Sequence, residues 1–276
     1  MARLGSGIKS AQQETIKRRF MRNTILLLMF SLMFSSNVFA DVYIGGKKKL
    51  LPLGDSLTSG TGDSTGNIMG YRDHLQDLIG GEYEIVGTIL DPYTATGYST
   101  AHDGLPSINT SDTEDRTQFA LDRMLTNNTP SGSGILLWIG TNDAARKEDS
   151  VSGYSNAGTV ANIEDILDII RTHNTELVAY VANLGKNGDA GNEGEMVEIN
   201  GLLETMIGTY RSTYPNFTVV LVDMHTMSEN DTWDMCSGDF LTNCLNDVTH
   251  FNDTGYQSVA RQWQECIEDN DGTNCD

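Results

Sequence analysis

The stretch that decides the fold is Leu50-Leu51-Pro52-Leu53-Gly54-Asp55-Ser56-Leu57-Thr58-Ser59-Gly60. Its apolar half predicts a buried β-strand, and the strand ends at Gly54 because glycine allows a tight turn. Ser56 follows two residues later, so the strand delivers a hydroxyl group to the edge of a sheet. A serine hydroxyl is a weak nucleophile unless a base lies within hydrogen-bond distance. If Ser56 is reactive, another part of the chain must supply that base.

The best candidate base lies near the other end of the chain, in Asp247-Val248-Thr249-His250. The imidazole of His250 is able to take a proton from a serine hydroxyl. A carboxylate such as that of Asp247 is able to fix the imidazole tautomer and stabilise its charged form. The fold must therefore bring two segments together that lie almost two hundred residues apart.

The residues between these segments predict strands that alternate with helices. Strands are predicted at 50–53, 82–88, 135–139, 177–181 and 217–222, and helices at 71–79, 113–126, 163–170, 196–210 and 254–267. This alternation predicts an α/β fold, a three-layer α/β/α sandwich with a five-stranded parallel sheet. Loops at the carboxyl ends of such strands gather at one edge. The polar loop 91–112 should border a site at that edge.

The first forty residues have the pattern of a secretory signal peptide. Basic residues precede the apolar run 25–34, and a small residue, Ala40, ends the segment. Met21 could be the true start, and an uncleaved membrane anchor is the alternative interpretation. Cleavage would leave residues 41–276 as one catalytic domain, secreted or periplasmic and of bacterial style.

The charge of the expected mature chain excludes some partners. Residues 1–40 hold six Lys or Arg and one acidic residue, so 41–276 hold 12 basic against 37 acidic, a net charge of −25. Such a surface repels nucleic acid and anionic membranes. We expect no nucleic-acid partner and no stable membrane association after cleavage, while the oligomeric state stays open.

All four cysteines lie late in the chain, at 236, 244, 266 and 275. An even number in an exported protein suggests disulfides, with three connectivities possible. We expect the sequence-local pairs 236–244 and 266–275. The sequence has no Cys-x-x-Cys motif and no His-rich spacing of the kind that would predict a metal site. Asp269-Asn270-Asp271-Gly272 hints at a calcium loop, but a solvated tail is the favoured interpretation.

Three blocks, taken together, resemble the SGNH or GDSL hydrolase family over about residues 49–267. They are Gly54-Asp55-Ser56-Leu57, Gly140-Thr141-Asn142-Asp143 and Asp247-Val248-Thr249-His250. Within this family, the residues of the blocks are most similar to those of secreted carbohydrate esterases that resemble acetylxylan esterases (carbohydrate esterase family 3). The resemblance implies Ser56 as the nucleophile, Asp247 and His250 as its partners, and the Asn142 amide as an oxyanion donor, with no cofactor.

One block departs from the family pattern. In His102-Asp103-Gly104-Leu105-Pro106-Ser107, serine stands where the family has a glycine whose N–H serves the oxyanion hole. The resemblance implies an oxyanion hole formed by Ser56, Ser107 and Asn142, with Gly104 as the alternative to Ser107.

Other residues of the blocks, and some outside them, have weaker claims on the site. Asp55, His102 and Asp143 are expected to contact substrate, although His102 could instead brace its loop. Ser64 lies in a Gly-x-Ser-x-Gly pattern that lacks the strand required before it. His225 is a rival base, whereas the pattern around His74 and His173 indicates helix-surface or capping residues; Tyr98 and Trp138 are weaker pocket candidates.

The resemblance implies a serine esterase that removes acyl groups, with acetyl as the expected group, from a polysaccharide such as xylan or from another small ester. A lipase, lysophospholipase or thioesterase acting on longer acyl chains is the alternative enzyme. A glycan-binding module on an inactive scaffold is a third hypothesis, and its only support is Ser107 in place of glycine.

Overall fold

The computed structural model describes residues 46–62, 69–89, 101–125, 129–225, 240–269 and 275. The predictions for residues 1–40, Ser64, Tyr98, Cys236 and residues 270–272 lie outside the described residues.

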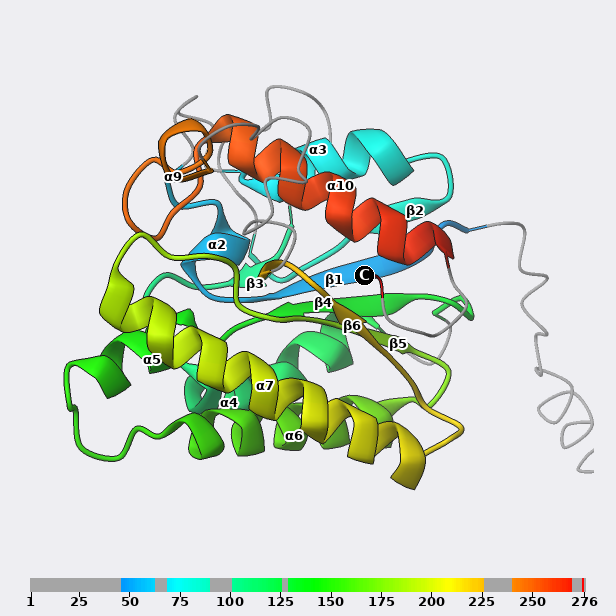
Figure 1. Cartoon of the computed structure of the whole chain (residues 1–276). Helices are drawn as coiled ribbons and strands as arrows, with labels where there is room; N and C mark the ends of the chain where they lie inside the picture. Colours follow the sequence, from blue (N-terminus) through cyan, green and yellow to red (C-terminus); the bar gives the residue numbers. More distant parts are fainter. Residues whose placement is uncertain are drawn as a thin grey trace, which may run out of the picture. The chain divides into compact units, whose positions relative to one another are not determined.

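A parallel β-sheet forms the centre of the described chain (Figure 1). Its main path has the strand order β2-β1-β4-β5-β6. These strands are β1 (Lys48–Gly54), β2 (Tyr83–Ile85), β4 (Gly134–Trp138), β5 (Val178–Ala182) and β6 (Thr218–Val222). The predicted five-stranded parallel core of an α/β fold is confirmed. A short additional strand, β3 (Asp103–Gly104), pairs with the end of β1.

Helices cover both faces of the sheet. They are α2 (Ser56–Ser59), α3 (Tyr71–Ile79), α4 (Thr110–Met124), α5 (Thr141–Glu148), α6 (Asn156–His173), α7 (Ala190–Thr213), α9 (Phe240–Asn243) and α10 (Asp253–Asp269). Helices α3 and α10 pack side by side on one face, and α4, α6 and α7 form the layer on the other (Figure 1). The result is the predicted three-layer sandwich.

The sheet is apolar because both of its faces are covered. Along β4, Leu136 and Trp138 join the core beneath α3 and α10. Ile135 and Leu137 join the core beneath α4, α6 and α7. Successive side chains of a strand point to opposite faces, so one apolar run contributes to two cores. Trp138, a weak pocket candidate, is fully buried and is a core residue.

The segment before α4 differs from its prediction. The loop 91–112 was expected to be irregular and the helix to begin at 113, but α4 begins at Thr110. Asn109 caps this helix, because its side-chain oxygen accepts a hydrogen bond from the Asp112 N–H at 2.9 Å. Strand β3 also falls inside the predicted loop, and its two residues are too few to give a sequence pattern.

Gly54 is the glycine on which the central strand pairing depends. A Cβ atom at this position would lie 2.1 Å from the Trp138 carbonyl oxygen, on the neighbouring strand. We expect Gly54→Ala to lower the free energy of unfolding by about 3 kcal/mol, the upper end of overpacking costs. Urea denaturation measures this. Gly81→Ala is the matched control, because a Cβ there meets nothing within 4 Å; an equal loss in both variants would contradict the prediction.

The cysteines follow the expected pairing only in part. Cys244 is disulfide-bonded, and its expected partner Cys236 lies outside the described residues. The expected bond between Cys266 and Cys275 is absent, since both are free cysteines in the described chain. Their side chains meet as thiols instead: a hydrogen bond with Cys275, and then burial, raises the pKa of Cys266.

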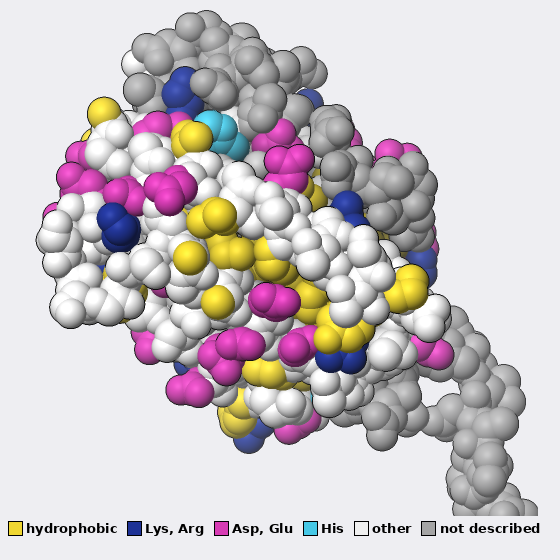
Figure 2. Space-filling model, turned by 60° about the horizontal axis from the view of Figure 1, so that its bottom comes forward, with side chains coloured by type: hydrophobic (Ala, Val, Ile, Leu, Met, Phe, Trp, Pro, Cys, Tyr) yellow, Lys and Arg dark blue, Asp and Glu magenta, His cyan; other side chains and the backbone are white. Residues whose placement is uncertain are grey.

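The surface is acidic on the face that Figure 2 shows, the lower side of Figure 1. Asp and Glu side chains surround a central group of hydrophobic ones there, and Lys and Arg are sparse. Of the hydrophobic side chains of α7, Val197 and Leu202 are exposed. Among the described residues, no helix has the length and apolar character to cross a membrane.

Candidate active site

Ser56 is the first residue of α2, and one residue, Asp55, separates it from the end of β1. Asp55 caps this short helix, because its Oδ1 accepts a hydrogen bond from the Leu57 N–H at 3.0 Å. The Ser56 N–H has no acceptor within the helix, as is usual for the first residue of a helix. Ser56 is therefore presented at the carboxyl edge of the sheet with both its hydroxyl group and a backbone donor.

His250 and Asp247 meet Ser56 at this edge. The His250 Nε2 lies 3.0 Å from the Ser56 Oγ. On the other side of the ring, His250 Nδ1 lies 2.9 Å from Asp247 Oδ2. Since a carboxylate only accepts, Nδ1 carries the proton in the neutral ring and Nε2 faces the hydroxyl as an acceptor. The structure thus places the three residues in the chain of hydrogen bonds that a serine nucleophile requires.

The segment around His250 is held by its own backbone. The Asn246 N–H donates to the His250 carbonyl oxygen at 2.8 Å, and Leu245 forms a β-bridge with Phe251. Asp247 Oδ1 accepts hydrogen bonds from the N–H groups of Thr249 at 2.8 Å and His250 at 2.7 Å. Burial alone would raise the pKa of Asp247, but the hydrogen bonds from His250 and Thr249 outweigh it and lower this pKa. The carboxylate therefore stays charged beside the imidazole.

The oxyanion candidates lie at the same edge because their strands are neighbours. Gly54 at the end of β1 pairs with Trp138 of β4 and with Gly104 of β3. Asn142 is the second residue of α5, shortly after β4, and Ser107 follows β3. The side-chain Nδ2 of Asn142 donates to the Ile108 carbonyl oxygen at 2.8 Å. An amide group has two N–H bonds, so Asn142 keeps a second donor for a ligand.

Ser107 and Gly104 differ in whether their N–H groups are available. Gly104 donates its N–H to His102 Nδ1 at 3.0 Å, so it does not fit the alternative oxyanion role. Within the described chain, the Ser107 N–H has no acceptor. Ser107 also has φ +65°, the left-handed region in which glycine is usual. Ser107 therefore holds a backbone conformation that a glycine would adopt without strain.

Three residues expected to contact substrate lie inside the protein instead. Asp55, His102 and Asp143 are each at most 2 % exposed. Asp143 accepts hydrogen bonds from the Thr110 N–H at 3.0 Å and hydroxyl at 2.8 Å, and burial raises its pKa. Asp55 caps α2 and His102 braces the β3 turn. These side chains support the site, and Asp143 also lines the cavity beside it. Their contact with substrate stays a prediction.

The buried carboxyl of Asp55 makes stability depend on pH. Burial, with a contribution from the Asp143 charge, raises the pKa of Asp55 from its ordinary 3.8 to about 7. A raised acidic pKa means that the folded state retains its proton while the unfolded state loses it. The cost to stability is absent below pH 4, grows as pH rises from 4 to 7, and is on the order of 4 kcal/mol above that range.

We expect Asp55→Asn to remove this pH-dependent cost and to keep the helix cap, because asparagine is an equally good capping residue. Relative to the parent, Asp55→Asn should therefore become more stable by about a few kcal/mol in unfolding free energy as the pH rises from 4 to 8. Urea denaturation at both pH values measures this change. A difference that stays constant across this range would show that Asp55 does not retain its proton.

The other histidines have partners away from Ser56. His225 Nε2 lies 2.7 Å from Glu193 Oε1, and His74 Nε2 lies 3.1 Å from Asp253 Oδ1. His173 Nε2 lies 2.7 Å from the Leu125 carbonyl oxygen. The rival base His225 is thus engaged with α7. Within the described ranges, no cluster of His, Cys, Asp or Glu could hold a metal ion.

Arg146, Tyr154 and Asn109 were not among the residues predicted for the site. Arg146 Nη2 donates to the Ser107 carbonyl oxygen at 2.8 Å, and Nη1 donates to the Tyr154 hydroxyl at 2.6 Å. One signal was present: Arg146 lies four residues after Asn142 and so on the same side of a helix. The turn that carries Tyr154 has no such signal.

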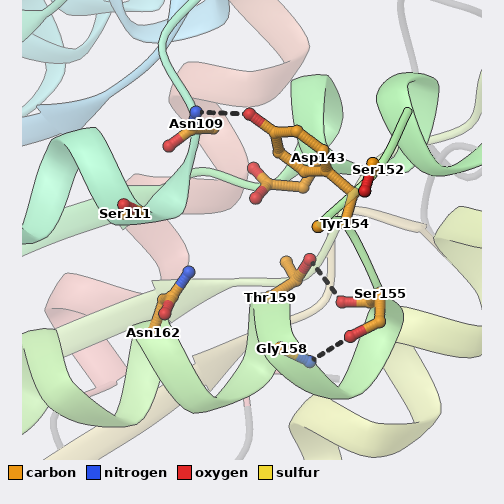
Figure 3. A pocket seen from close by; sticks show the side chains of 10 residues that line it. Asn109, Ser111, Asp143, Ser152, Tyr154, Ser155, Gly158, Thr159 and Asn162 are labelled. Atoms are coloured by element: carbon orange, nitrogen blue, oxygen red, sulfur yellow. Dashed lines mark hydrogen bonds between the residues drawn. The ribbon is translucent and has the colours of Figure 1, made fainter.

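A polar cavity of about 300 Å³ lies beside these residues (Figure 3). Polar side chains and glycines from the first turns of α4, α5 and α6 and from residues 152–155 line it. Ser56 and His250 do not line it. Asn109 and Tyr154 point toward each other across one side of the cavity, where the Asn109 Nδ2 donates to the Tyr154 hydroxyl at 2.8 Å (Figure 3).

The three-layer α/β fold, with a hydroxyl, an imidazole and a carboxylate linked at the carboxyl edge of its sheet, fits a hydrolase that uses a serine nucleophile. A model of the GDSL-like lipase/acylhydrolase family matches residues 53–258, well over half of the chain. The chain therefore belongs to this family, also called the SGNH hydrolases.

The comparisons with individual proteins agree with this assignment. A multidomain esterase of Ruminococcus flavefaciens is 26 % identical over 92 % of the chain, which spans about a third of that relative's length. A family 3 carbohydrate esterase of Clostridium thermocellum has TM-score 0.61, 18 % identity, and coverage of 81 % of this chain and 96 % of its own. The acetyl xylan esterase AlAXEase has TM-score 0.53 and 16 % identity, and the match covers 78 % of this chain and 98 % of that protein.

Proposed function

We propose that this protein removes acetyl groups from an acetylated polysaccharide such as xylan, with Ser56, His250 and Asp247 as its catalytic triad. The observation that carries the proposal is the unbroken chain from Ser56 Oγ through His250 to Asp247. The carbohydrate esterase and acetyl xylan esterase among the similar structures support the choice of substrate.

Acylation begins at the Ser56 hydroxyl. Its Oγ attacks the ester carbonyl carbon, and the proton moves to His250 Nε2. The charged Asp247 stabilises the imidazolium that forms. When the tetrahedral intermediate collapses, the C–O bond to the sugar breaks and the same proton passes from Nε2 to the leaving sugar oxygen. An acetyl group then remains on Ser56.

Deacylation repeats these steps with water. His250 Nε2 takes a proton from a water molecule, whose oxygen attacks the acetyl carbonyl carbon. Collapse of the second intermediate releases acetate and returns the proton to Ser56 Oγ. In both steps the negative carbonyl oxygen needs donors, which in this proposal are the N–H groups of Ser56 and Ser107 and the side-chain amide of Asn142.

A substrate panel tests the acyl group and the sugar. Acetate release from acetylated xylan, from acetylated small sugars and from p-nitrophenyl acetate is measured beside hydrolysis of a p-nitrophenyl ester with a long acyl chain. We expect kcat/KM to be highest for acetyl esters and acetate to be released from the xylan. A preference for the long chain would instead identify a lipase or thioesterase.

We also propose that the protein is exported and that residues 1–40 are removed. The basic and apolar pattern of this segment supports the proposal, and a disulfide at Cys244 suits an oxidising compartment. The mass of the protein recovered from a secreting host tests it: a mature chain should begin at Asp41.

A further inference from the structure

The turn that carries Ser107 is strained. Residues 105–108 form a β-turn in which the Ile108 N–H points to the Leu105 carbonyl oxygen at 3.4 Å. Pro106 occupies the second position and Ser107, with φ +65°, the third. These are the features of a type II turn, which favours glycine or asparagine at its third position. A serine in this conformation persists only if its surroundings hold it there.

Helix α5 supplies these surroundings. Arg146 donates to the Ser107 carbonyl oxygen at 2.8 Å, and Asn142 donates to the next carbonyl oxygen, that of Ile108, also at 2.8 Å. Asp143 accepts the two hydrogen bonds from Thr110, which begins α4. The first two turns of α5 thus hold the Ser107 turn and the residues directly after it.

The guanidinium group of Arg146 is itself fixed in place. It donates to the Tyr154 hydroxyl at 2.6 Å, and its central carbon lies 5.2 Å from the centre of the Tyr154 ring. The same hydroxyl accepts the hydrogen bond from Asn109, which lies two residues after Ser107 and caps α4 (Figure 3). Arg146 therefore closes a ring of contacts that begins at Ser107 and returns to the chain at Asn109.

We propose that Arg146 is a positioning residue that holds the strained Ser107 turn so that the Ser107 N–H faces the oxyanion. This inference rests on the proposed function. Without the guanidinium group, one support of the turn is lost, and Ser107 can relax toward the negative φ that serine prefers. That relaxation rotates the peptide bond between Pro106 and Ser107 and moves its N–H away from the oxyanion.

The proposal predicts coupling between Arg146 and the residue at position 107. Arg146→Ala should lower kcat for p-nitrophenyl acetate about tenfold, less than the 10²- to 10³-fold that follows complete removal of a donor. KM should change little, because the donor matters most in the transition state. In a Ser107→Gly background the positive φ is no longer strained, so the same replacement should lower kcat about threefold or less.

Further variants separate positioning from general damage. Arg146→Lys keeps the charge but loses the fork that bonds two oxygens, so it should behave like Arg146→Ala. Arg123→Ala is the matched control: Arg123 also lies over an aromatic ring, that of Phe119, 4.4 Å from its centre, but on the outside of α4. It should leave kcat unchanged. Urea denaturation establishes that each variant is folded.

The results overturn the proposal in three cases. The first case is an unchanged kcat in Arg146→Ala. The second is that Arg146→Ala lowers kcat by the same factor whether Ser or Gly stands at position 107. The third is a raised KM with an unchanged kcat. If Arg146→Ala does not fold, Arg146→Lys in both backgrounds decides by the same criteria. Failure of the proposed function is distinct, because a parent enzyme without activity dependent on Ser56 would show it before any Arg146 variant is made.

Discussion

Ser56→Ala should lower kcat for p-nitrophenyl acetate about 10⁴- to 10⁶-fold, the range seen when a serine nucleophile is removed from an intact triad. The loss is this large because His250 and Asp247 have no function in the reaction without the hydroxyl that they activate. His250→Ala should reduce kcat to a similar level, since residues that act as a unit are not additive. Steady-state kinetics of the two single variants and the double variant measure both points.

Ser64→Ala is the control for the nucleophile, because Ser64 lies in the rival Gly-x-Ser-x-Gly pattern. It should retain the activity of the parent. Ser56→Ala should also unfold at the same urea concentration as the parent within about 0.5 M, so that loss of activity is not loss of fold. Activity that survives Ser56→Ala but disappears in Ser64→Ala would place the nucleophile elsewhere.

Asn142→Asp has the second largest expected effect, a decrease in kcat of at least about 10²- to 10³-fold. The substitution preserves the size of the side chain but replaces its N–H donors with a carboxylate, which repels a developing oxyanion. The substitution also removes the bond to Ile108 and leaves a carboxylate oxygen facing that carbonyl oxygen, so it should cost about 1–3 kcal/mol of stability, which urea denaturation measures. An acidic residue in the first turn of α5 is also favourable for the helix.

Asn174→Asp is the matched control for this variant. Asn174 lies between α6 and β5, at the opposite edge of the sheet, and its side-chain oxygen accepts the Glu176 N–H at 2.9 Å. A carboxylate can accept the same bond, so activity and stability should both be unchanged. If Asn142→Asp instead raised KM and left kcat intact, Asn142 would act in substrate binding alone.

The sequence predicted the elements whose signals are local. The apolar run before Gly54 predicted β1, and the helix 71–79 was predicted with the bounds that α3 has. The alternation of strands and helices predicted a parallel sheet, but it did not predict the strand order β2-β1-β4-β5-β6. The residues of the candidate triad were chosen from short blocks near the two ends of the domain. Their meeting depends on the sheet, whose parallel topology brings strand ends to one edge.

What the sequence did not predict depends on contacts between elements. Strand β3 has two residues, and the contact of Arg146 with Ser107 joins positions 39 residues apart. Burial decided the roles of Asp55 and Asp143, and a sequence does not state which side of a turn faces inward. The spacing of Cys266 and Cys275 did not predict that both are free cysteines.

The bridge between Leu245 and Phe251 closes the loop that carries His250, and Asp247 bonds within this loop. Its backbone contact with another segment is the hydrogen bond from the Gly188 N–H to the Val248 carbonyl oxygen, at 2.7 Å. Ser56, by contrast, is fixed by the central strand. The base, His250, and the nucleophile, Ser56, are thus held by different parts of the fold. Laboratory evolution that randomises residues 246–249 other than Asp247 would sample new acid–base behaviour while the strand framework remains intact.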